Sequence, residues 1–148
     1  CARRWLRLKM LTSDGLAFGL GFEILESDES SEFTTPLATV QKFNGFADQF
    51  AEGSLGFGGG LRQGLTDYYA KFGFKIPNVD IPVTLYYHQF ENVNDFHGSE
   101  YDVVASYKIN DYATLISKYA IYETDGQENV VYSGRDKTAF TFEVNLKY

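Results

Sequence analysis

The sequence predicts an all-β protein, an antiparallel, up-and-down transmembrane β-barrel. This chain supplies about seven or eight strands, as part of a larger barrel. Three observations support this fold class, namely a period-two alternation of apolar and polar residues, segments of about ten residues, and connections that alternate between short and long. The composition agrees, because 17% of the 148 residues are aromatic and only three are proline. Disordered chains are poor in aromatic residues, and no apolar run approaches the roughly 20 residues of a membrane helix.

Seven segments show the alternation that is typical of strands with one apolar and one polar face. The last of them is the clearest, because Phe140, Phe142 and Val144 alternate with Thr141 and Glu143. The seven predicted strands span residues 3–11, 15–25, 65–76, 81–91, 100–110, 112–123 and 140–148.

Strand length and connection length both favour a membrane barrel. Soluble strands usually have five or six residues, whereas about 9–11 tilted residues cross a bilayer. Connections 12–14, 77–80 and 110–111 are short, and connections 26–64, 92–99 and 124–137 are long. Outer-membrane barrels have short periplasmic turns and long extracellular loops. A soluble sandwich has no reason to sort its connections in this way.

The odd strand number predicts that further strands are needed. Bacterial single-chain barrels have an even number of strands, with both chain ends in the periplasm. We therefore expect residues 1–148 to be the C-terminal segment of a single outer-membrane barrel domain. An eighth strand within residues 37–43 is the alternative, and it would give a small closed barrel. The connection 26–64 is expected to be a long extracellular or inward-folded loop.

Several motifs resemble those of a known family. Thr-Pro-Leu-Ala-Thr at residues 35–39, Lys-Phe-Asn-Gly-Phe-Ala-Asp at 42–48 and Gly-Leu-Thr-Asp-Tyr-Tyr at 64–69 are similar to motifs in uncharacterised, porin-like members of the alginate-export outer-membrane family. Phe46 stands where tryptophan is common in that family. The resemblance implies a passive channel in the outer membrane of a Gram-negative bacterium. It also implies that the terminal strand, which ends in Tyr148, is recognised by the barrel-assembly machinery.

The polar faces of the strands are expected to line a lumen. Eight of the thirteen basic residues and five of the twenty acidic residues fall on these faces, so the wall carries about +3 in a chain of net charge -7. A basic wall concentrates anions, which predicts a channel for small hydrophilic solutes such as anionic oligosaccharides. The alternative is that these charges pair with one another. The residues predicted to line the pore are Arg7, Lys9, Lys71, Lys75, Lys108, Lys118, Tyr69, Tyr86, Asp67 and Asp102.

The sequence indicates neither an enzyme nor a cofactor-binding protein. It contains no Gly-x-Ser-x-Gly motif, and Ser106 and His88 are the nearest approach to a nucleophile and base. His88 and His97 lack the spacing of a metal site, and the acidic residues 26–32 lack the ligand spacing of a calcium loop. The net charge of -7 argues against a nucleic-acid partner. Outer-membrane lipid and a hydrophilic or anionic solute are the expected partners.

Two other interpretations remain open from the sequence. In the first, a small closed outer-membrane barrel acts as a structural anchor or adhesin, with a filled interior. In the second, a soluble β-barrel binds a small apolar ligand, and its two faces are inverted. Aromatic residues such as Phe72, Phe74, Phe140 and Phe142 would then fill the core.

Overall fold

The computed structural model describes residues 2–11, 15–26, 45–47, 65–91, 97–124 and 136–147. It confirms the seven predicted strands, with small shifts at their ends. Residues 97–99 belong to a strand rather than to a connection, and the last strand begins at Lys137 rather than at Phe140. The strands are β1 (Ala2–Leu11), β2 (Ala17–Glu26), β3 (Leu65–Ile76), β4 (Ile81–Glu91), β5 (His97–Lys108), β6 (Ala113–Thr124) and β7 (Lys137–Leu146).

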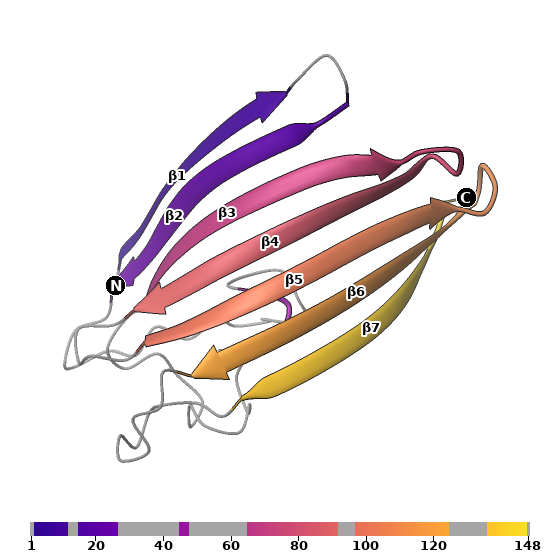
Figure 1. Cartoon of the computed structure of the whole chain (residues 1–148). Helices are drawn as coiled ribbons and strands as arrows, with labels where there is room; N and C mark the ends of the chain where they lie inside the picture. Colours follow the sequence, from indigo (N-terminus) through magenta and orange to yellow (C-terminus); the bar gives the residue numbers. More distant parts are fainter. Residues whose placement is uncertain are drawn as a thin grey trace.

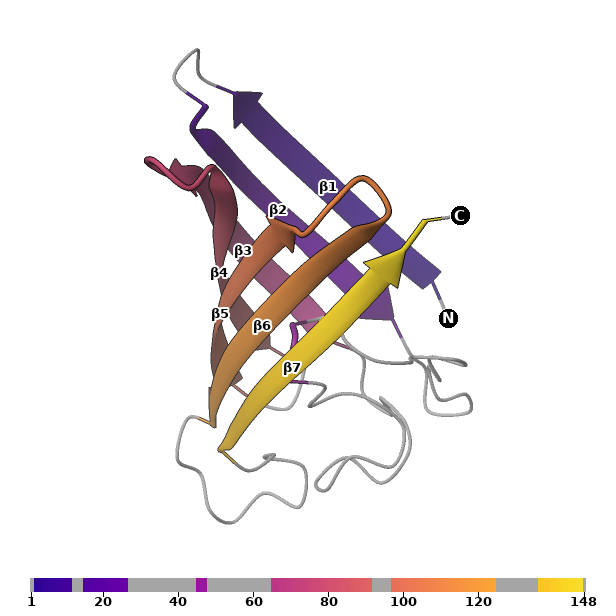
Figure 2. The ribbon, with the colours of Figure 1, turned by 90° about the vertical axis from the view of Figure 1, so that its right-hand side faces the viewer.

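The strands form one antiparallel meander in the order of the sequence (Figure 1). β1 and β7 are the two edges, and the described strands do not close into a barrel. The sheet curves, so that it has a concave and a convex face (Figure 2). Residues 37–43, where an eighth strand was considered, lie outside the described residues.

The two short connections that the structure describes are tight turns at one end of the sheet (Figure 1). After β3, the backbone N–H of Asp80 donates to the carbonyl of Ile76 at 3.2 Å, and Asn78 and Asp80 adopt positive φ angles of 70° and 53°. After β5, the N–H of Ile109 donates to the carbonyl of Ala113 at 3.0 Å. Because every strand reverses direction, the connections after β2, β4 and β6 all leave the opposite end.

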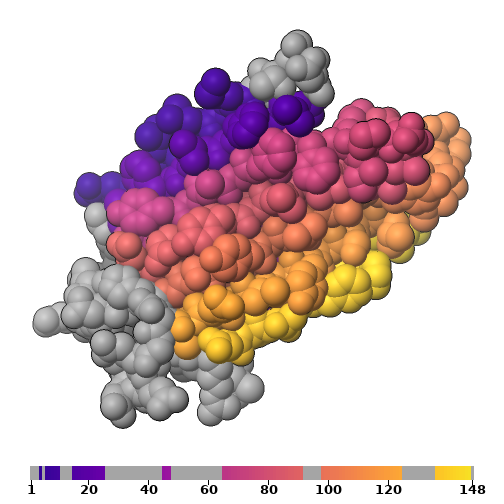
Figure 3. All heavy atoms as spheres, viewed as in Figure 1, coloured from indigo at the N-terminus to yellow at the C-terminus, as the bar shows by residue number. Residues whose placement is uncertain are grey.

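The two faces of the sheet differ in chemistry. Directly paired residues of neighbouring strands point to the same side, so the register assigns each residue to a face. The convex face carries apolar side chains in contact with one another, such as Phe18 and Phe72 at 4.9 Å between ring centroids and Tyr87 and Tyr101 at 5.1 Å. The space-filling view shows this face covered from edge to edge by side chains (Figure 3).

The concave face holds the buried residues. A small apolar cluster of Leu25, Leu65, Phe90, Ala120 and Tyr122 lies there, together with Ala47 from the connection between β2 and β3. Buried acidic residues lie beside it. The soluble-barrel interpretation required the opposite arrangement, but Phe140 and Phe142 are 58% and 61% exposed on the convex face. No helix among the described residues is both long and apolar enough to span a membrane.

Candidate functional site: the concave face

All ten residues predicted to line a pore occupy concave positions of the sheet. The register brings six of them into two adjacent rows across the strands. One row runs Arg7–Gly21–Tyr69–His88–Glu100–Tyr122, and the next runs Lys9–Gly19–Lys71–Tyr86–Asp102–Ala120. Asp67 lies one row nearer the end with the long connections. Lys75, Lys108 and Lys118 lie nearer the short turns and do not join this group.

Two glycines of β2 make room at the centre of these rows. A Cβ atom on Gly21 would lie 2.5 Å from the Tyr69 hydroxyl oxygen and 2.8 Å from the carbonyl oxygen of Leu6. A Cβ atom on Gly19 would lie 2.6 Å from Cε of Lys71. The side chains of Tyr69 and Lys71 therefore lie across β2, where any other residue type would displace them.

The cations on this face differ in whether an acidic group already neutralises them. Lys75 pairs with Asp80 at 2.8 Å, Lys108 pairs with Asp111 at 2.6 Å, and Lys118 pairs with Glu143. Arg7 hydrogen-bonds the hydroxyl of Tyr69. Among the residues that the structure describes, Lys9 and Lys71 have no ion-pair partner. Of these pairs only Lys118–Glu143 joins two charges of the predicted wall, because Asp80 and Asp111 lie in the turns.

Most acidic side chains of this face lie in neighbouring rows, whereas basic side chains occur along its whole length. Glu23, Asp67 and Glu100 lie toward the end with the long connections, whereas Lys75 and Lys108 lie toward the short turns. The sequence predicted one basic wall of about +3. The structure instead collects Glu23, Asp67, Glu100 and Asp102 in three neighbouring rows, which also contain basic side chains such as Arg7. A sum of charges could not have shown this arrangement.

Four buried polar residues lie together on β3, β4 and β5. Nδ1 of His88 is 2.9 and 3.0 Å from the two carboxylate oxygens of Asp67, and Nε2 of His88 is 3.6 Å from Oδ2 of Asp102. Asp102 and its neighbour Glu100 are 1% and 0% exposed. Within the described residues, both carboxylate oxygens of Asp102 and Oε2 of Glu100 have no hydrogen-bond donor.

His88 and Ser106, the closest sequence approach to a catalytic pair, are separated on this face. His88 is directly opposite Glu100, and Ser106 lies six residues farther along β5, roughly 20 Å away at the rise of an extended strand. No group of three or more metal-ligating side chains was found in the described part of the chain. The side chains of residues 26–32 and of His97 lie outside that part.

A contact that the sequence did not predict involves the connection between β2 and β3. Oε1 of Glu100 accepts hydrogen bonds from the backbone N–H groups of Phe46 and Ala47, the latter at 2.7 Å. The Phe46 ring packs edge-on against Tyr86 at 5.4 Å, and Nζ of Lys118 lies 5.3 Å from the Phe46 ring centroid. Alternation places Glu100 on the concave face, but no periodic signal identifies a partner 54 residues away.

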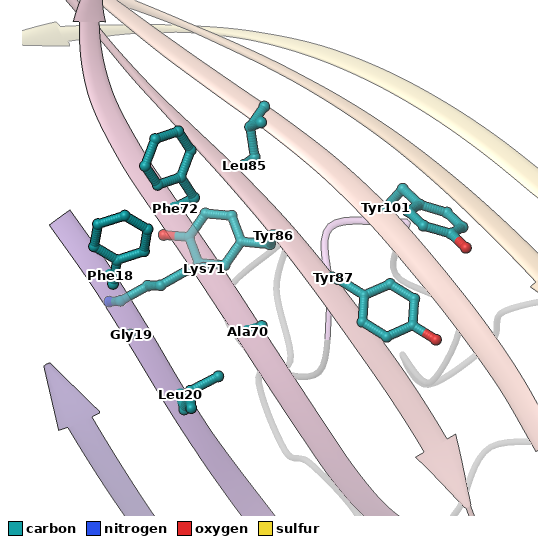
Figure 4. A pocket seen from close by; sticks show the side chains of 10 residues that line it. All are labelled: Phe18, Gly19, Leu20, Ala70, Lys71, Phe72, Leu85, Tyr86, Tyr87 and Tyr101. Carbon is teal, nitrogen blue, oxygen red and sulfur yellow. The ribbon is translucent and has the colours of Figure 1, made fainter. Parts of the chain in front are cut away.

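The convex face has a groove of about 480 Å³ around Ala70 (Figure 4). It exists because Ala70 is much smaller than the flanking Leu20, Phe72 and Tyr87. Its lining is almost entirely apolar, so it offers a hydrophilic solute few hydrogen-bonding groups. We therefore place the candidate site for solutes on the concave face.

Comparisons with protein-family models, with curated proteins and with solved structures found no match.

Proposed function

We propose that this chain forms part of the wall of an outer-membrane β-barrel channel, which passes small hydrophilic solutes through a lumen on the concave side. The observation that carries the proposal is the arrangement of the two faces. Large apolar side chains are exposed across all the strands of the convex face, and charged side chains are collected on the concave face. A protein surrounded by water gains nothing from this inversion, whereas a protein surrounded by lipid requires it.

The few charges on the convex face also support a lipid-facing band. Of the charged strand side chains that the structure describes, only Arg4, Glu91 and Glu123 lie on that face. All three are near the strand ends where the long connections leave. Below them the apolar band on β3 extends from Tyr68 to Ile76, roughly 26 Å along the strand. With the usual tilt of about 40° this becomes about 20 Å, close to the apolar height of such barrels.

The direction of the edge strands supports a larger barrel. β1 and β7 run the same way, because they are separated by an even number of reversals. An antiparallel closure therefore needs an odd number of additional strands between them. Seven strands plus an odd number give an even total, as bacterial single-chain barrels have.

The class of solute follows from the cations that lack an acidic partner within the described residues. Lys9 and Lys71 flank Gly19, where β2 presents no side chain, and the Tyr86 ring lies in the same row. Two ammonium groups and an aromatic ring favour anionic oligosaccharides among hydrophilic solutes. Membership of the alginate-export family, which the sequence motifs suggest, is part of this proposal.

The test is ion selectivity in planar lipid bilayers. We expect the protein to conduct with a preference for anions, and the double substitution Lys9→Glu and Lys71→Glu to shift the reversal potential in a salt gradient toward cations. The matched control is Lys75→Glu with Lys108→Glu, where each lysine already pairs with a turn aspartate. This control also adds two acids, but at positions nearer the short turns. Equal shifts in both variants would contradict the role of Lys9 and Lys71, and a protein that inserts without conducting would contradict the channel.

A small closed barrel that acts as an anchor or adhesin is the second candidate. The observation that favours it is the occupation of the concave side by Phe46 and Ala47, above the fully buried Glu100 and Tyr122. That barrel would migrate faster on gels before boiling than after it, and it would conduct no ions. The channel would show both the gel shift and conductance.

A further inference from the structure

We propose that Glu100 is an internal anchor that holds residues 45–47 against the concave wall, and that this contact sets the width of the channel. The part about width rests on the proposed function, whereas the anchor itself does not. The contact joins a strand to a connection 54 residues away in the sequence, so it is a tertiary interaction and not a local turn.

The backbone of this segment is bound by one carboxylate. Glu100 is fully buried, and its Oε1 accepts from both Phe46 N–H and Ala47 N–H. Hydrogen bonds to a charged acceptor are roughly twice as strong as neutral ones. If the segment left, Glu100 would lose both of these donors, and water from the concave side would have to replace them. The loss of two hydrogen bonds to a carboxylate therefore opposes release of the segment.

Gly45 allows the backbone to lie directly on the carboxylate. Its φ angle is +89°, which is strained for any residue with a side chain. A Cβ atom on Gly45 would lie 2.5 Å from Oε2 of Glu100. An alanine at this position would therefore push the segment away from the wall, although Glu100 itself would be unchanged.

The Phe46 side chain extends the contact over neighbouring strands. Its ring meets Tyr86 of β4 edge-on at 5.4 Å, and the Lys118 ammonium of β6 lies over it at 5.3 Å. Lys118 is held in turn by Glu143 of β7. The segment thus contacts β4, β5 and β6, and it occupies space beside Tyr86, one of the residues predicted to line the pore.

The experiment measures how accessible position 47 is in the folded protein. Ala47→Cys, with Cys1→Ser to remove the natural thiol, places a thiol where the residue is 0% exposed. We expect slow reaction with a maleimide in lipid vesicles. Adding Glu100→Ala or Gly45→Ala should raise the labelling rate by about tenfold or more. The matched control is Glu23→Ala, which removes another buried concave carboxylate, on β2 rather than on β5.

Conductance of the same variants in planar bilayers tests the width. Glu100→Ala and Gly45→Ala should both raise the single-channel conductance, while Glu23→Ala should not. An unchanged labelling rate in both variants would overturn the anchor, and faster labelling with unchanged conductance would overturn its control of width. If no variant conducts, including the natural sequence, the channel proposal fails while labelling still decides the anchor. If Glu100→Ala does not fold, Gly45→Ala carries the test, because Gly45 lies outside the sheet.

Discussion

The convex and concave faces of this sheet use the same strands but contribute to stability in different ways. The convex face is apolar and exposed, so its contribution depends on what surrounds the protein. The concave face is polar and partly buried, so its contribution depends on whether each charged group finds a partner. This difference teaches that burial alone does not identify the core of such a sheet. The acidic residue Glu100 is 0% exposed, whereas the apolar residue Leu20 is 61% exposed.

The largest effect is expected on the concave face. His88→Leu would leave Asp67 buried without the imidazole that contacts both of its oxygens at 2.9 and 3.0 Å. Breaking a buried pair by removing one partner costs about 3–5 kcal/mol. The free energy of unfolding in urea, measured on the protein refolded in lipid vesicles, should fall by about that amount. A matching His88→Leu, Asp67→Leu double variant should recover part of the loss, because it leaves no lone carboxylate at this position.

The convex face should respond to a charge only if lipid covers it. Leu20→Lys replaces an exposed side chain and loses little packing, so in water its effect on the free energy of unfolding would be small. At the middle of a bilayer a lysine on the outer face costs about 2–4 kcal/mol. Unfolding from lipid vesicles should show this loss, and Thr138→Lys, at the start of β7 beside the long connection, should cost much less. Equal effects at the two positions would contradict a lipid-facing band.

The third prediction concerns close packing between β1, β2 and β3. Gly21→Ala would place a methyl group 2.8 Å from the backbone oxygen of Leu6 and 2.5 Å from the Tyr69 hydroxyl. Because backbone cannot move aside cheaply, we expect a loss of about 1–3 kcal/mol in the free energy of unfolding. Gly73→Ala is the control, since its Cβ atom would have a nearest neighbour at 3.4 Å, an ordinary contact. A loss in the control as large as that of Gly21→Ala would mean that strand glycines act here through conformational entropy.

The sequence predicted most of the sheet because alternation is a local property. Phe140, Phe142 and Val144 identify both a strand and its apolar face without any knowledge of the neighbouring strands. The same argument placed Lys71, Tyr86 and Asp102 correctly on one face. It could not show that Lys71 and Tyr86 are direct neighbours, because register depends on how two distant segments align.

The anchor at Glu100 and the Lys118–Glu143 pair could not be predicted from the sequence, for a related reason. Alternation assigns a side chain to a face, but it does not say what approaches that face from a connection. Gly45 and Phe46 lie in a long segment without periodicity, so nothing local indicated their contact with β5 and β6. The Lys75–Asp80 pair, in contrast, spans a four-residue turn, and proximity in the sequence made that contact accessible to prediction.

The smallest loss in the free energy of unfolding is expected at the turn between β3 and β4, where charged side chains are exposed rather than buried. The Lys75–Asp80 pair has a short distance of 2.8 Å, yet its side chains are 58% and 81% exposed. An exposed pair of this kind contributes about 0–1 kcal/mol, because water and salt screen both charges. Asp80→Asn keeps a residue type that tolerates the positive φ of 53° at this position, so the backbone strain stays nearly the same. The free energy of unfolding should therefore fall by less than about 1 kcal/mol, and the difference from the natural sequence should shrink further in high salt. A loss comparable to that of His88→Leu would mean that the charges at the strand ends are as important to folding as the buried ones.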